Sequence, residues 1–197
     1  MATGEELTPG LVARLEAAGL RSLLPYAHAD PRPRVPGAGL WARRPLEPLP
    51  PVPGLDLASP GARLALPSGA AVTVRAVHIV APMRGLHPVW HADLRALRAD
   101  LEEARGLQVV AGDFNATRDH RPFRDLLAAG YADCADIARH RSWPGLTWPA
   151  GRRWTPAVMR IDHILVSAGI TVRETRTVPV PGTDHLGVLA ALELPGS

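Results

Sequence analysis

The stretch Leu-Gln-Val-Val-Ala-Gly-Asp-Phe-Asn, at residues 107–115, carries the strongest indication of fold in this chain. Its first five residues are mostly apolar and predict a buried β-strand that runs into Gly112. Asp113 and Asn115 follow two residues apart, so an extended backbone would point both side chains to one face. Polar residues at the carboxyl end of a strand commonly line a site. A plain turn is the alternative interpretation when these residues are taken alone.

Helix and strand patterns surround this stretch on both sides. Residues 91–105 place Leu94, Leu97 and Leu101 on one stripe, which predicts an amphipathic helix that stops at Gly106. Similar patterns predict two more helices, at residues 7–20 and 121–129. Further strands are predicted at residues 39–42, 64–66, 71–80, 160–167 and 188–194. This order of strands and helices predicts a layered α/β or α+β domain.

The composition limits what kind of protein this is. The chain has 197 residues, of which 46% are hydrophobic and 21% charged, so we expect one globular domain over residues 1–197. No apolar run approaches the length of a bilayer crossing. All 22 basic residues are arginine, which excludes mechanisms that need a Schiff-base lysine or a phosphate-loop lysine. The single cysteine, Cys134, excludes an internal disulfide and is expected to be a small buried residue.

Acidic and histidine residues mark three further places of possible chemistry. Asp162 interrupts the apolar strand at residues 160–166, where a buried charge is costly without a partner or a cation. Asp184 and His185 precede the last strand, and a histidine beside a carboxylate can act as a general base. Glu6 offers the carboxylate oxygens that a hard cation such as Mg²⁺ prefers. The structural alternatives are a satisfied strand-end residue for Asp162 and a loop pair for Asp184 and His185.

Two other mechanisms find little support in the sequence. His87 and His91 stand four residues apart, as zinc ligands on a helix would. Pro88 lies between them, however, and predicts the start of a helix instead. A serine hydrolase is disfavoured because no Gly-x-Ser-x-Gly motif occurs.

Taken in order, these clusters resemble the endonuclease/exonuclease/phosphatase family. The matching segments are Glu-Leu-Thr-Pro at 6–9, Val-His at 77–78, Gly-Asp-Phe-Asn at 112–115, Ile-Asp-His-Ile at 161–164 and Asp-His at 184–185. The resemblance covers nearly the whole chain. It implies a DNase I-like α/β (α+β) fold, a four-layer sandwich of two packed mixed β-sheets flanked by helices.

The start of the chain departs from the family pattern. The family opens with a strand carrying an asparagine that helps hold the metal, followed by a helix and by the strand that delivers the glutamate. Here the match begins at Glu6. We therefore expect an N-terminally incomplete domain in which the first strand is missing and the strand before the glutamate has no counterpart.

The resemblance implies a role for each matching residue in the first half of the site. Glu6 corresponds to the metal-ligand glutamate, and Glu5 stands where the family usually has glutamine. His78 corresponds to the histidine that contacts the scissile phosphate. Asp113 corresponds to the aspartate that positions or deprotonates the attacking water, and Asn115 to the asparagine that binds a phosphate oxygen.

The remaining roles fall on the carboxyl-terminal clusters. Asp162 corresponds to a carboxylate of the metal and histidine network. Asp184 corresponds to the aspartate that supports His185, and His185 would contact phosphate or act in acid/base chemistry. The implied metal ligands are Glu6, Asp162 and Asp184, and the implied ion is Mg²⁺ with Mn²⁺ as the alternative. The candidate contacts for substrate phosphate are Arg118, Arg121 and Arg160.

A finer resemblance points to the VanJ-like branch of the family. It rests on residues 77–82, 112–124, 146–149 and 181–185. Members of that branch carry amino-terminal membrane helices, are associated with glycopeptide resistance and are linked to lipid pyrophosphates as substrates. The resemblance implies a monomeric hydrolase of a phosphate ester or lipid-linked pyrophosphate. Its catalytic domain would lie outside the cytoplasm, anchored through a part absent here, while this chain itself would be soluble.

Two alternatives to this function stay open. The first is a DNA or RNA endonuclease or exonuclease, which needs a strongly basic face. The net charge is only +3, and arginines adjoin only at Arg43-Arg44 and Arg152-Arg153. The second is a non-catalytic truncated binding domain that has lost its metal site.

Overall fold

A six-stranded β-sheet forms the centre of the computed structural model, which describes residues 1–33, 36–137, 145–151 and 156–195. The strand order is β4-β5-β6-β7-β9-β8. β6 and β7 run parallel and the other neighbours antiparallel, so the sheet is mixed, as predicted. The strands are β4 (Glu47–Leu49), β5 (Gly61–Ala65), β6 (Ala71–His78), β7 (Leu107–Asp113), β8 (Tyr131–Asp133) and β9 (Asp162–Ser167).

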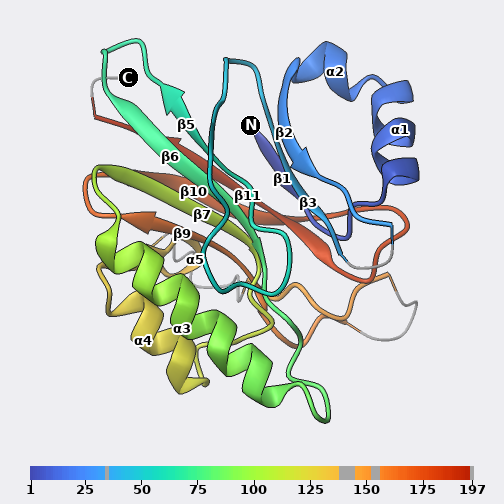
Figure 1. The fold of residues 1–197 in the computed structure, drawn as a ribbon, viewed down its shortest axis with the longest axis vertical. Helices are drawn as coiled ribbons and strands as arrows, with labels where there is room; N and C mark the ends of the chain where they lie inside the picture. The colour runs from blue at the N-terminus through green and yellow to red at the C-terminus, as the bar shows by residue number, and fades with distance from the viewer. Residues whose placement is uncertain (34–35, 138–144, 152–155, 196–197) are drawn as a thin grey trace.

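Two smaller sheets pack against one face of this central sheet (Figure 1). One is three-stranded, with β3 (Ala38–Ala42) between β1 (Ala2–Gly4) and β2 (Tyr26–Asp30). The other is the antiparallel hairpin of β10 (Thr171–Pro179) and β11 (Leu186–Glu193). One apolar core joins all three sheets, with members that include Leu40, Val74, Val166 and Val172.

Helices cover the outer faces of the molecule. α3 (His87–Glu103) and α4 (Arg121–Leu127) lie on the other face of the central sheet, and α1 (Pro9–Ala17) and α2 (Leu20–Leu23) lie beside the three-stranded sheet (Figure 1). A short helix, α5 (Cys134–Ile137), follows β8. The apolar stripe of α3 packs onto β6, β7 and β9 through Trp90, Leu94, Leu97 and Leu101. Sheets packed face to face with helices outside match the predicted layered fold, although the layer opposite the central sheet consists of two separate small sheets.

Several local expectations are confirmed. Thr8 caps α1 by accepting a hydrogen bond from the Leu11 N–H at 3.1 Å, and Pro9 occupies the first turn. Pro88 lies in the first turn of α3, so it marks a helix start as predicted, although the helix begins at His87 rather than at His91. Cys134 is fully buried, and burial raises the pKa of its thiol to about 12.

One expectation about the start of the chain is wrong. The strand before the glutamate has a counterpart, because Ala2–Gly4 forms β1 and pairs antiparallel with β3. Ala-Thr-Gly is too short to show an alternating pattern, so only its pairing with the fully buried β3 identifies it as a strand. β10 also escaped prediction, because a register irregularity between Val172 and Glu174 breaks its alternation.

None of the helices in the described segments combines the length and apolar character needed to cross a bilayer.

Candidate active site

The pairing of three strands places three of the predicted site residues in one row. His78 ends β6 and lies opposite Asp113 in the parallel pairing of β6 with β7. Asp113 ends β7 and lies opposite Asp162, the first residue of β9. The row therefore crosses the central sheet at the carboxyl ends of its two parallel strands, where functional side chains commonly gather.

Gly112 allows β6 and β7 to come together at this row. Its φ of +148° is one that side-chain-bearing residues rarely adopt, and a Cβ added there would meet the Val77 carbonyl oxygen at 1.9 Å. Only glycine can occupy that position without moving one of the strands. The glycine next to Asp113 is thus a requirement of the packing that builds the site.

Asp113 is buried and anchored by Asn115. Its Oδ1 accepts a hydrogen bond from the Asn115 backbone N–H at 2.7 Å, and its Oδ2 accepts one from the Asn115 side-chain amide at 2.9 Å. The same amide also donates to the carbonyl oxygen of Ile79, so both of its hydrogens are used within the protein. In this arrangement Asn115 orients Asp113 and ties the end of β7 to β6. Its contact with a phosphate oxygen stays a prediction.

Electrostatics around Asp113 favour a carboxyl group that titrates near neutrality. Burial and the neighbouring carboxylate of Asp162 raise the pKa of Asp113 to about 7. Nδ1 of His78 is buried without a hydrogen-bond partner, while its Nε2 lies 3.8 Å from Oδ2 of Asp113. Burial lowers the pKa of His78, so this ring is favoured in its neutral form.

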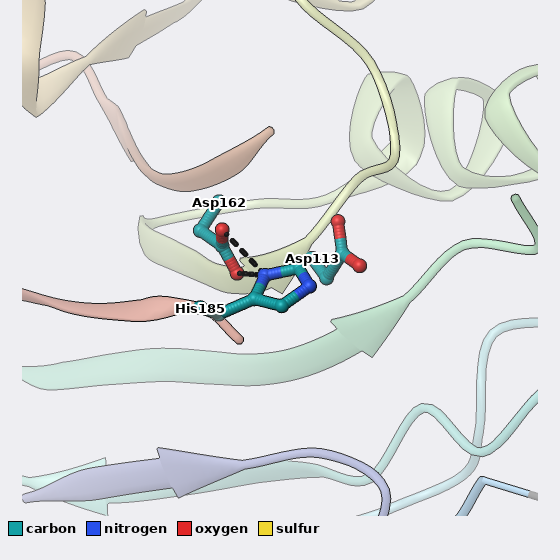
Figure 2. A group of neighbouring side chains, drawn as sticks. All are labelled: Asp113, Asp162 and His185. Carbon is teal, nitrogen blue, oxygen red and sulfur yellow. Dashed lines mark hydrogen bonds and ion pairs between the residues drawn. The ribbon is translucent and has the colours of Figure 1, made fainter. Parts of the chain in front are cut away.

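Asp162 and His185 form the second half of the site. Nδ1 of His185 lies 2.9 Å from Oδ2 and 3.2 Å from Oδ1 of Asp162. Figure 2 shows the imidazole lying between the carboxylates of Asp162 and Asp113. The hydrogen bond with Asp162 raises the pKa of His185 to about 9, which favours a protonated ring. Ligand atoms of Asp113, Asp162 and His185 all lie within 4.8 Å of one another.

The carboxylate that supports His185 differs from the predicted one. Sequence adjacency suggested Asp184, but Asp162 makes the hydrogen bond. Asp184 is exposed and accepts a hydrogen bond from the indole N–H of Trp148 at 3.1 Å. Its backbone carbonyl accepts a further bond from the Ala150 N–H. Asp184 and His185 lie in a bend before β11, where the Asp184 carboxylate turns to Trp148 while His185 faces Asp162. Its role as a metal ligand stays a prediction.

Of the two adjacent glutamates, Glu5 lies closer to the cluster than sequence reasoning expected. Burial and the neighbouring carboxylates of Asp162 and Asp113 raise its pKa well above the ordinary value, and the nearby Asp113 backbone N–H opposes part of that rise. Glu6 is exposed and has a left-handed φ of +53°, and its charge acts on both His78 and Asp113. Glu6 as a metal ligand therefore stays a prediction, and Glu5 is the carboxylate that the sequence analysis missed.

The three arginines proposed for substrate phosphate already have carboxylate partners. Arg118 and Arg160 both form ion pairs with Asp136, the latter at 2.8 Å. Arg121 lies 3.7 Å from Asp125 within α4 and is largely exposed. Binding of phosphate by any of them would compete with these pairs. Arg152 and Arg153 lie outside the described residues.

A buried network behind the site also escaped the sequence analysis. Nδ1 of His163 lies 2.8 Å from Oδ2 of Asp133, and its Nε2 lies 2.9 Å from the carbonyl oxygen of Ala116. His163 follows Asp162 and Ala116 follows Asn115, so this ring links the two halves of the site. The motif Ile-Asp-His-Ile contained the signal, but the alternation of a strand cannot reveal a partner at residue 133.

The donor set fits a hard divalent cation. Within the described segments, Asp113, Asp162 and His185 form the one group of three potential ligands, and the carboxyl group of Glu5 adjoins it. The raised pKa values of Asp113 and Glu5 reflect negative charges crowded into a buried place, which a bound cation would relieve. Carboxylate oxygens are the ligands that Mg²⁺ and Mn²⁺ prefer.

Comparison with known proteins places this site in a recognised context. Residues 5–185 match the sequence profile of the Endonuclease/Exonuclease/phosphatase family. No match was found among the curated proteins.

Three solved structures illustrate the likeness of fold. D. rerio TDP2, complexed with a single-strand DNA product, is 17% identical with a TM-score of 0.73, covering 97% of this chain and 84% of that one. The mannosyl-6-phosphatase of Bacteroides thetaiotaomicron is 14% identical with a TM-score of 0.66, covering 93% and 82%. An endonuclease/exonuclease/phosphatase from Beutenbergia cavernae is 23% identical with a TM-score of 0.65. That match covers 95% of this chain, which spans only 57% of the other. At such identities these structures show the fold alone.

Proposed function

The chain belongs to the endonuclease/exonuclease/phosphatase family, whose members hydrolyse phosphoesters, and we propose that it is a metal-dependent hydrolase of phosphate esters or anhydrides. One observation carries this proposal. Asp113, Asp162 and His185 bring their ligand atoms within 4.8 Å of one another at the end of the central sheet. Two carboxylates and an imidazole in one place can hold a cation, accept a proton and donate to a phosphate.

Asp113 would orient the attacking water and take its proton. Each of its oxygens accepts one hydrogen bond from Asn115, and each carboxylate oxygen has a second lone pair for a water molecule. The two bonds from Asn115 hold the carboxylate in one orientation. A base held in this way loses little entropy when the water is positioned.

His185 and His78 would donate hydrogen bonds to the phosphoryl oxygens. Nδ1 of His185 is engaged by Asp162, which leaves Nε2 to donate to the substrate. His78 lies on the other side of Asp113, with Nε2 toward the Asp113 carboxylate. Negative charge that develops on the phosphoryl group would therefore meet donors from the end of β6 and from the bend before β11.

The bound cation would neutralise the phosphoryl oxygens and activate water. Asp162 and the glutamates at the end of β1 would hold it, with Mg²⁺ as the proposed ion and Mn²⁺ as the alternative.

For the substrate, we propose a lipid-linked pyrophosphate, on the motifs shared with the VanJ-like branch. In that case the protein would act at a membrane outside the cytoplasm, anchored through a part beyond these residues. A nuclease is the second candidate, and its support is the likeness of fold to TDP2 solved with a DNA product. The pairing of Arg118 and Arg160 with Asp136 favours the smaller substrate, because a nuclease needs free basic groups along the nucleic-acid backbone.

The test is metal-dependent turnover of three substrates, namely a prenyl pyrophosphate, bis-p-nitrophenyl phosphate and plasmid DNA. We expect hydrolysis with Mg²⁺ that stops on addition of EDTA. Asp113→Asn and His185→Gln should each lower kcat by about 10²–10⁴-fold. Asp119→Asn is the matched control, because Asp119 is an exposed aspartate four residues after Asn115.

Other results would contradict the assigned base or favour a different function. Unchanged turnover in Asp113→Asn would contradict the assignment of the base. Cleavage of DNA alone, with a steep dependence on salt, would favour the nuclease. If the original chain and all of its variants bind the substrates but do not hydrolyse them, the result would support a non-catalytic domain.

A further inference from the structure

Asn115 has an unusual backbone conformation beside the candidate base. Its φ of +46° lies in the left-handed region, which residues other than glycine rarely adopt, although asparagine does so more readily than most. Such a conformation persists only where the surrounding structure holds it. The same residue donates both hydrogen bonds that orient the Asp113 carboxylate, one from its backbone N–H and one from its side-chain amide. The direction of Asp113 therefore depends on what holds the turn at Asn115.

Trp90 holds the first carbonyl group of this turn. Its side chain is only 1% exposed, and its indole N–H donates a hydrogen bond to the carbonyl oxygen of Asn115 at 3.1 Å. The N–H is the one polar group of an otherwise apolar side chain, so its partner fixes how the ring is oriented in the core. Trp90 lies near the beginning of α3, in the core between that helix and the central sheet. The bond therefore ties the turn to α3.

His163 holds the next carbonyl group. Its Nε2 lies 2.9 Å from the carbonyl oxygen of Ala116, and its Nδ1 lies 2.8 Å from Oδ2 of Asp133. Both partners are oxygen acceptors, so the ring donates a hydrogen bond through each of its nitrogens. The ring is only 1% exposed, and its centroid lies 5.5 Å and 4.3 Å from those of Phe114 and Phe123. These contacts hold the imidazole in one orientation and tie the turn to β9.

We propose that Trp90 and His163 are positioning residues for Asp113. Their donors come from α3 and β9 and fix the carbonyl groups of two consecutive residues, Asn115 and Ala116. With both carbonyl groups fixed, Asn115 directs its backbone N–H and its side-chain amide at the Asp113 carboxylate. The hold on the turn is independent of the enzymatic activity, and only the role of Asp113 as the base rests on the proposed function.

The alternative is that both side chains only fill the core. Trp90 packs with Leu94 and Leu97 in the closed core, where the loss of any large side chain lowers the free energy of unfolding. A role limited to packing would lower stability without loosening the turn in particular and without slowing the chemical step. The experiments below separate these effects.

The first experiment follows hydrogen exchange in Trp90→Phe, which keeps an aromatic ring but removes the indole N–H. It compares the amide of Asn115 with the amide of Val110 in the middle of β7. Exchange should speed up at Asn115 at least about fivefold more than at Val110, because the lost hydrogen bond loosens the turn and not the strand. The control is Leu101→Ala, which truncates a buried side chain toward the other end of α3. This control should speed exchange at Val110 by at least as much as at Asn115.

The second experiment measures Mg²⁺-dependent hydrolysis of bis-p-nitrophenyl phosphate. Trp90→Phe should lower kcat at least about tenfold and change KM less than about twofold, because a misdirected base slows the chemical step and not the binding of substrate. Leu101→Ala should keep kcat within about twofold of the original value, although it also loses stability.

The third experiment compares two substitutions of His163. The amide nitrogen of glutamine takes nearly the place of Nε2 and can still donate to the carbonyl oxygen of Ala116. The amide nitrogen of asparagine takes nearly the place of Nδ1 and can donate only to Asp133. His163→Asn should therefore lower kcat at least about tenfold more than His163→Gln, and it should speed exchange at Asn115 more. If either variant does not fold, the comparison of Trp90→Phe with Leu101→Ala still decides.

Three outcomes would overturn the proposal. The first is an equal increase of exchange at Asn115 and Val110 in Trp90→Phe, which would show a packing role alone. The second is faster exchange at Asn115 with unchanged kcat, because the turn would then not direct the base. The third is equal kcat in the two variants of His163. Absence of hydrolysis by the original chain would contradict the proposed function instead, and the exchange data would then support or overturn the hold on the turn by themselves.

Discussion

The two faces of the central sheet are covered in different ways. On the face under α3 and α4, large side chains such as Trp90, Phe114 and Phe123 are fully buried, and the core is closed. On the face toward the two smaller sheets, many core members are only partly buried, and a groove of 610 Å³ runs between β1 and β11. The covered face is built by helices adjacent in sequence to their strands, whereas the open face depends on strands from both ends of the chain. The candidate site lies at the carboxyl ends of β6 and β7, at the edge of both faces.

The largest expected effect comes from a substitution at Gly112, where β6 and β7 approach each other beside the site. Gly112→Ala would place a Cβ at 1.9 Å from the Val77 carbonyl oxygen, between the two parallel strands that both faces share. We expect a loss of about 5 kcal/mol or more, which approaches the whole stability of a domain. The measurement is urea unfolding followed by circular dichroism.

Gly106→Ala is the matched control for that change. Gly106 also has a positive φ, +76°, but a Cβ there would meet nothing within 4 Å. The expected loss is about 1–2 kcal/mol, from backbone strain alone. Similar losses in the two variants would show that the close approach of β6 and β7 is not what requires glycine.

The next prediction compares the loss of stability when one apolar side chain is truncated on each face. Phe123→Ala on the covered face should cost about 3–5 kcal/mol, because Phe123 is fully buried and its removal leaves a cavity. Leu192→Ala on the open face should cost only about 1 kcal/mol, because Leu192 is half-buried beside the groove. Chemical denaturation of both variants checks this, and equal losses would mean that the open face is packed as tightly as the covered one.

The smallest expected effect is on the pH dependence of stability, through the buried hydrogen bond between Asp133 and His163. Burial raises the pKa of Asp133, but the hydrogen bond from His163 and the charges of His163 and Arg160 outweigh it, so the net shift is downward. A lowered pKa stabilises the fold above the unfolded-state value of about 3.9, and this contribution is lost as the pH falls through the folded value. The difference in stability between the original chain and Asp133→Asn should therefore shrink below about pH 4.

Urea midpoints of both chains from pH 7 to pH 3 would measure that difference. The comparison between chains matters because the raised pKa values of Glu5 and Asp113 act in the opposite direction, and both chains share them. A difference that stays constant with pH would contradict the ion pair between Asp133 and His163.

Elements with a regular pattern of burial were predictable from the sequence. The stripe of α3 and the apolar run of β7 were both visible, because helical and strand periodicity are local properties. The short strand β1 and the irregular β10 were not, because each is defined by its pairing with a distant segment.

The candidate site divides in the same way. His78, Asp113, Asp162 and His185 were identified from motifs, and strand register then showed that the first three share one row. The partner of His185 was assigned wrongly to Asp184, because adjacency in sequence does not tell which carboxylate faces an imidazole. The network of His163, Asp133 and Ala116 joins residues up to 47 positions apart, beyond the reach of any local pattern.

The sequence by itself determined the family, the layered arrangement of sheets and helices, and the residue types that carry the chemistry, because these follow from motifs in order and from periodic burial. Only the tertiary structure decided that Glu5 joins the carboxylates near Asp113, that Asp162 holds His185, and that β1 and β11 border one groove. The physical reason is that adjacency in sequence does not set the direction of neighbouring side chains, because Glu6 has a left-handed φ of +53° and His185 lies in a bend. Which of them faces the site depends on strand pairing between segments far apart in the chain.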